Sequence, residues 1–185
     1  MRKILILGVI LTMSVVAIFV SEPHNVFGDD HTPNPEKQIK ELGIELQPLR
    51  PFKANFVHYV RTGNLVFLSG HISIDAEGKL IKGKVGKDLD VEEGKAAARR
   101  CAVALLSSLK HAVGDLNNVN RIVKVTGMVN ASTDFTKHSI VINGCSDLLV
   151  SVFGKDKGKH ARAAVGMSSL PLGVAVEIEM IVEVK

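Results

Sequence analysis

The eleven residues before the C-terminal lysine restrict the fold more than any other segment. Apolar side chains occupy every second position there: Val174, Val176, Ile178, Met180, Val182 and Val184. Three of the positions between them are acidic: Glu177, Glu179 and Glu183. Successive side chains of a strand point to opposite faces, so this alternation predicts a half-buried strand. The strand requires a sheet with one face packed on a core and one acidic, solvated face.

Apolar periodicity upstream predicts the other elements of this sheet. Further strands are expected at residues 56–61, 65–69, 119–131 and 163–169. Asp90 and Glu93 form a capping box that opens a long helix, which Gly114 ends. A second helix is expected at residues 139–153, closed by Gly154. The order strand–strand–helix–strand–helix–strand–strand predicts an α+β fold, with a mixed β-sheet and two helices packed on one face.

The N-terminal part has a different character from this domain. Arg2 and Lys3 precede an uncharged run at residues 4–20, which is typical of a secretory signal peptide or of a retained membrane anchor. A core helix is a poor alternative, because no polar stripe breaks the run. We therefore expect residues 1–28 to be a signal peptide or anchor, which makes the protein exported (periplasmic or secreted) or anchored to a membrane by its N-terminus.

Proline density defines the next segment. Five of the six prolines fall between residues 23 and 51, so residues 29–51 are expected to be a proline-rich linker. Within it, Asn34 can cap a short helix with Pro35 in its first turn and Gly43 as its stop. The folded domain is expected at residues 52–185.

Composition excludes several classes of protein. Hydrophobic residues make up 46% and charged residues 23%, which argues against disorder and coiled coils. The two cysteines, Cys101 and Cys145, are too few for a disulfide scaffold or a four-cysteine zinc site. Cys101 lies on the apolar face of the first long helix, which favours packing over reactivity. The seven histidines show no zincin spacing, so we expect no metal.

Nucleic acid is also not expected as a partner. The formal net charge of +4 is too small to indicate a polyanionic partner. Aromatic residues, on which the bases of single-stranded nucleic acid would stack, are scarce. A basic stretch at residues 155–159 could attract anions, but a solvated loop is the favoured interpretation.

Several segments resemble the RidA/YjgF family, also labelled endoribonuclease L-PSP or chorismate-mutase-like. Residues 63–71 (GNLVFLSGH) resemble its second strand, and residues 114–130 its central strand. Residues 161–165 (ARAAV), Leu170-Pro171 and residues 176–179 (VEIE) resemble its C-terminal signature. Residues 143–154 place the chain nearer a longer, YjgF-like subgroup.

The resemblance implies a homotrimer with a central barrel and ligand clefts between subunits. In the deaminase members, such clefts hydrolyse 2-imino or enamine acids to 2-oxo acids and ammonia without a cofactor. By this resemblance Arg162 would hold the carboxylate of the small ligand, and Glu177 would hold or deprotonate a water. The backbone carbonyl of Ala164 would accept from that water, and Ser69 and Phe56 would line the site.

Three departures from the family pattern keep alternatives open. Phe56 replaces a tyrosine, Ala164 replaces a cysteine, and the hydrophobic run at residues 4–20 directs the chain away from the cytosol, where most such imines arise. An imine deaminase is the leading hypothesis. The alternatives are a non-catalytic ligand-binding trimer of the cell envelope and, least favoured, an endoribonuclease.

Overall fold

The computed structural model of the chain describes residues 33–49 and 54–185. The signal peptide or anchor expected at residues 1–28 lies outside them. Among the helices of the described part, none is long and apolar enough to cross a bilayer.

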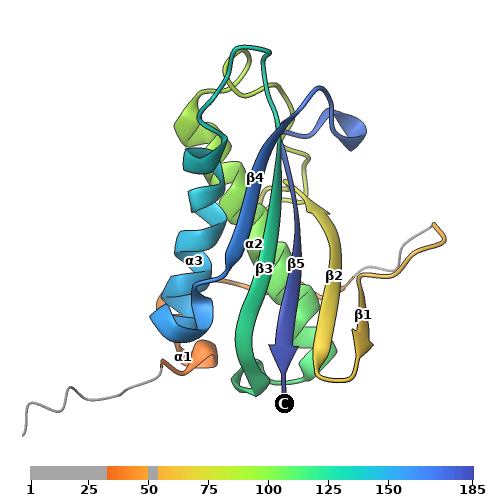
Figure 1. Cartoon of the computed structure of the whole chain (residues 1–185), viewed down its shortest axis with the longest axis vertical. Helices are drawn as coiled ribbons and strands as arrows, with labels where there is room; N and C mark the ends of the chain where they lie inside the picture. Colours follow the sequence, from red (N-terminus) through yellow and green to blue (C-terminus); the bar gives the residue numbers. More distant parts are fainter. Residues whose placement is uncertain (1–32, 50–53) are drawn as a thin grey trace, which may run out of the picture. The chain divides into compact units, whose positions relative to one another are not determined.

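The described residues form one mixed five-stranded sheet (Figure 1). Its strands are β1 (Tyr59–Thr62), β2 (Leu65–Ile72), β3 (Val119–Asn130), β4 (Ala161–Met167) and β5 (Val176–Val184). They lie in the order β1-β2-β5-β3-β4, and only β3 and β4 pair in parallel. The C-terminal strand therefore lies at the centre of the sheet, while β1 and β4 are its edges.

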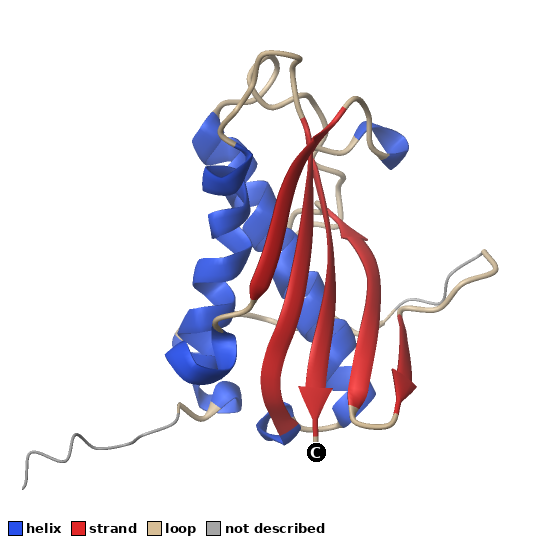
Figure 2. Cartoon of the chain, viewed as in Figure 1, coloured by secondary structure: helices blue, strands red, loops and turns tan. Residues whose placement is uncertain are grey.

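Two long helices, α2 (Val91–Val113) and α3 (His138–Gly158), cover one face of this sheet (Figure 2). The Asp90–Glu93 capping box is present at the start of α2, and Gly114 follows its end with φ of +73°. Short 3-10 turns, η1 (Leu116–Asn118) and η2 (Pro171–Gly173), lead into β3 and β5. The predicted α+β fold is thus confirmed.

The second long helix extends further than the sequence suggested. Gly154 has a non-helical backbone (φ 76°, ψ 173°), but a further helical turn follows it and ends at Gly158. The basic stretch expected as a loop is therefore largely this last turn. Lys157 Nζ donates to the Val119 carbonyl at 3.3 Å, which ties the turn to the sheet. Positive charges also suit a helix C-terminus, where free carbonyls accumulate.

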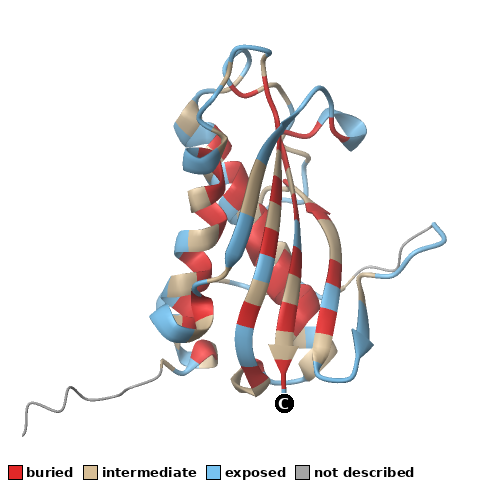
Figure 3. Cartoon of the chain, viewed as in Figure 1, coloured by how far each residue is buried: buried red, intermediate tan, exposed pale blue. Residues whose placement is uncertain are grey.

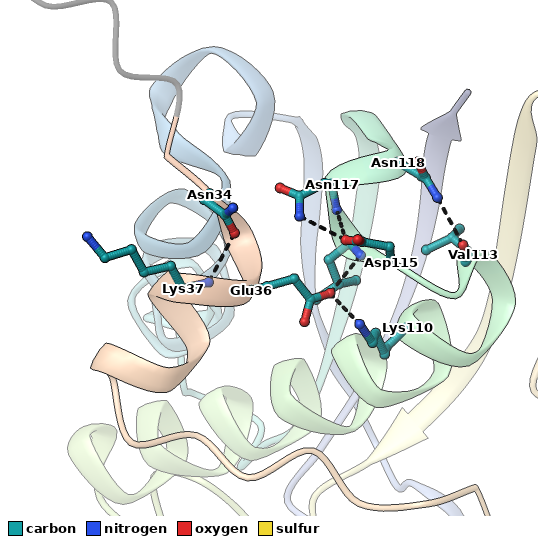
Figure 4. Close-up of polar contacts among 9 residues, drawn as sticks. Asn34, Glu36, Lys37, Lys110, Val113, Asp115, Asn117 and Asn118 are labelled. Atoms are coloured by element: carbon teal, nitrogen blue, oxygen red, sulfur yellow. Dashed lines mark hydrogen bonds and ion pairs between the residues drawn. The ribbon is translucent and has the colours of Figure 1, made fainter.

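A short helix, α1 (Pro35–Glu41), packs onto the domain through its first turn (Figure 4). The Asn34 side chain accepts from the Lys37 backbone N–H at 3.1 Å, as expected of a cap. Glu36 Oε1 accepts from Lys110 Nζ at 2.5 Å and from the Leu116 backbone N–H at 2.8 Å. Ile39 of the same helix is buried in the core. The folded domain thus includes α1, upstream of the boundary at residue 52.

Buried and more exposed residues alternate along the central strand β5 (Figure 3). Every second residue of β5, from Val176 to Val184, is apolar and buried beneath α2 and α3. The glutamates of β5 lie on the opposite, uncovered face, as the alternation predicted. Phe67 and Val165 also lie on the uncovered face and are 41% and 40% exposed. Within the described residues, this face has no second layer.

Candidate functional site

Arg162 lies on the edge strand β4 and faces α3. Its sheet partner is Val125, whose side chain is buried under the helices, and paired residues point to the same face. The guanidinium Nη1 donates to Asn143 Oδ1 at 2.8 Å and to Ser146 Oγ at 3.0 Å. Its Nη2 donates to the Ser139 carbonyl at 3.4 Å. An otherwise exposed arginine is therefore held in one orientation by α3.

These three α3 residues were not among those expected at the site. Ser139, Asn143 and Ser146 are four and three positions apart, so they share one side of the helix. That polar spacing could have identified them. Which strand they face follows only from the packing of α3 on β4.

The contacts with α3 leave part of the guanidinium available. They engage both Nη1 hydrogens and one Nη2 hydrogen, so Nε–H and one Nη2 hydrogen have no partner among the described residues. No acidic side chain in this part of the chain lies within ion-pair distance of Arg162. Two free N–H groups on a fixed planar cation suit bidentate binding of a carboxylate.

Glu177 lies on the uncovered face of the sheet. Its side chain passes over Gly70 of β2, where any Cβ would overlap the carboxylate. Partial burial raises the pKa of the Glu177 carboxyl, and the neighbouring negative charge of Glu179 raises it further by a smaller amount. A carboxyl group with a raised pKa is better suited to proton transfer near neutral pH.

Ser69 lies on the same face as Glu177. Its Oγ donates to the Val57 carbonyl at 2.6 Å, which fixes the hydroxyl beside β1. Ser69 lines a hollow of about 260 Å³ together with Lys124 and Glu179. Phe56, next to Val57, is 52% exposed and offers a ring without a hydroxyl. Ser69, Lys124 and Glu179 give this hollow polar groups, and Phe67 and Ile181 give it apolar contacts.

Four of the five predicted site residues therefore fall into two groups. Arg162 and Ala164 lie two positions apart on β4 and face α3. Their sheet partners, Val125 and Gly127 of β3, face the helices, and paired residues point to the same side of a sheet. Ser69 and Glu177 lie on the opposite face. One chain alone does not place Arg162 and Glu177 in a common cleft.

Both cysteines are packed in the core, as expected for Cys101. Burial raises the pKa of the Cys145 thiol to about 12 and that of Cys101 well above its usual range. Each thiol is therefore protonated at neutral pH and a poor nucleophile.

A mixed sheet with two helices on one face and an arginine on an edge strand defines a chorismate-mutase-like α+β protein. The chain belongs to the YjgF family: the family model described as "YjgF/chorismate mutase-like, putative endoribonuclease" matches residues 36–184. Protein TCP17 of Trypanosoma cruzi is 44% identical over 145 residues, which are 78% of this chain and 91% of that protein.

Solved structures show the same fold. The protein Atu1372 of Agrobacterium tumefaciens, described as of unknown function, is 41% identical with a TM-score of 0.75, over 82% of this chain and 94% of that one. RidA from the Antarctic bacterium Psychrobacter is 26% identical with a TM-score of 0.51, over 75% and 94% of the two chains.

Proposed function

We propose that the protein is a RidA-like hydrolase of 2-imino acids, with its sites in clefts between the subunits of a homotrimer. The observation that carries this proposal is the Arg162 guanidinium. It is fixed by α3, has no acidic partner among the described residues and retains two free N–H groups. The family relationship supports a RidA-like role, and the geometry adds a ready site for a carboxylate.

The proposed reaction needs only water and proton transfer. Arg162 binds the substrate carboxylate, and a water oxygen attacks the carbon of the protonated imine. Glu177 accepts a proton from that water, and its raised pKa suits it to return the proton to the leaving nitrogen. The C–N bond then breaks while Glu177 takes the proton of the new hydroxyl group, giving a 2-oxo acid and ammonia. The chemistry requires no cofactor.

The sheet geometry favours a site built from two chains. Arg162 and Glu177 face opposite sides of one sheet, so a cleft that contains both takes one residue from each of two subunits. The uncovered face also exposes Phe67 and Val165, apolar area that a trimeric barrel would bury. Light scattering after gel filtration measures the assembly, and a monomer would contradict this part of the proposal.

Arginine substitution tests the assigned role. An amino-acid oxidase generates the 2-imino acid, semicarbazide traps it, and an active hydrolase lowers the yield of semicarbazone. We expect Arg162→Ala to abolish this effect, and Arg162→Lys to retain little of it because lysine binds as a point charge. Arg99→Ala, which removes an exposed arginine of α2, is the matched control. Wild-type turnover in Arg162→Ala would refute the role of Arg162.

A mixing experiment tests the shared cleft. Arg162→Ala and Glu177→Gln chains are each expected to be inactive alone, and are then unfolded and refolded together. If each cleft takes the two residues from different chains, random assembly leaves about a quarter of the clefts with both native residues. Activity near that fraction supports the arrangement, whereas no recovery from well-folded mixed trimers contradicts it.

A second candidate function is ligand binding without catalysis. Phe56 and Ala164 stand where the resembling family carries a hydroxyl and a thiol, which favours this role. Binding of 2-oxo acids that depends on Arg162, with no turnover of several imines, would establish it in place of hydrolysis.

A further inference from the structure

His160 contacts the arginine site but has no part in the proposed reaction. It precedes β4 and lies two residues before Arg162, on the same side of the chain. Its Nε2 lies 3.1 Å from Ser146 Oγ, the hydroxyl that accepts from Arg162 Nη1. His160, Ser146 and Arg162 therefore form one continuous hydrogen-bonded chain.

The direction of each bond follows from the chemistry of its partners. His160 Nδ1 lies 2.6 Å from the Gly158 carbonyl, which can only accept, so Nδ1 carries the hydrogen. In the neutral ring, Nε2 is then an acceptor and takes the Ser146 hydroxyl hydrogen. Burial lowers the pKa of His160, and the positive charge of Arg162 lowers it further, whereas the hydrogen bond to Gly158 raises it. The net lowering of the pKa favours the neutral ring. The Ser146 lone pairs are thereby directed at Arg162.

We propose that His160 is a positioning residue, which fixes the Ser146 hydroxyl so that the Arg162 guanidinium presents its free N–H edge to a substrate carboxylate. This inference rests on the proposed function only for the identity of the ligand. A hydroxyl that donates to a ring nitrogen becomes a better acceptor for the next donor, because hydrogen bonds in a chain polarise one another. Without His160 the hydroxyl can rotate and donate elsewhere, and the guanidinium loses a fixed contact.

Nitrogen-15 NMR of the arginine side chains tests the positioning directly. Rotation about the Cζ–N bonds is slow when a guanidinium is held, so wild-type Arg162 should give resolved Nη–H signals. We expect these signals to broaden in His160→Ala and in Ser146→Ala, and to be retained in His160→Gln, whose side-chain oxygen can accept the Ser146 hydrogen. Ser151→Ala, another serine of α3, is the matched control. Thermal unfolding by circular dichroism identifies any variant that does not fold.

Affinity for 2-oxobutanoate provides the functional measurement. His160→Ala and Ser146→Ala should each weaken binding on the order of fivefold, and the double variant no more than either, because neighbours in one network are coupled. Additive losses, or Arg162 signals that stay resolved in both alanine variants, would overturn the positioning role. If the wild-type protein binds no 2-oxo acid but shows the NMR changes, the proposed function fails and the positioning of Arg162 stands.

Discussion

Replacing Gly144 with alanine should force α2 and α3 apart. A Cβ built at Gly144 would lie 2.9 Å from the Lys95 carbonyl carbon and closer still to its oxygen, separations that real Cβ atoms essentially never show. The obstacle is the backbone of α2, so a change of side-chain rotamer cannot relieve it. Overpacking costs about 1–3 kcal/mol, and a rigid backbone contact favours the upper end of that range. For a domain of this size, 3 kcal/mol corresponds to a Tm lower by roughly 6–12 °C.

The assay is thermal unfolding followed by circular dichroism, with Ser151→Ala on the exposed side of α3 as control. The control should change stability by less than about 0.5 kcal/mol. Because Asn143 is the neighbour of Gly144 and contacts Arg162, the shifted helix should also weaken 2-oxo acid binding. A Tm of Gly144→Ala within 2 °C or so of wild type would refute the close-packing argument, at the usual sensitivity of such domains.

Three further outcomes follow from the polar contacts and the buried thiols. Ionisation of Glu177 disfavours the folded state, because its folded pKa lies above the ordinary value of 4.5. The loss of folding stability grows as the pH rises above 4.5, so Glu177→Gln should raise the Tm at pH 7. Below pH 4.5 the variant and the wild type should have the same Tm. An equal gain in Tm at both pH values would contradict this reasoning. Cys145, with a pKa of about 12, should resist Ellman's reagent at pH 8 until urea unfolds the protein, and rapid native labelling would disprove its burial. Glu36→Ala should lower the free energy of unfolding by about 1–2 kcal/mol, since the Leu116 N–H loses its acceptor, whereas Glu36→Gln should cost less; equal losses would argue against this explanation.

The sequence by itself determined the elements and their order. The alternation from Val174 to Val184 and the Asp90–Glu93 capping box act over a few residues, so they could be identified without a partner segment. The family could also be identified from the sequence, through the motifs at residues 63–71, 161–165 and 176–179.

Long-range pairing decided where those elements meet. Whether Gly154 ends a helix depends on the sheet contact that holds the following turn, which local rules for glycine do not include. The direction in which Arg162 points depends on the parallel register of β4 on β3. The chain from His160 through Ser146 exists only because α3 packs against that edge strand. The physical reason is that periodicity fixes which residues share a face, whereas packing between distant segments fixes what that face meets.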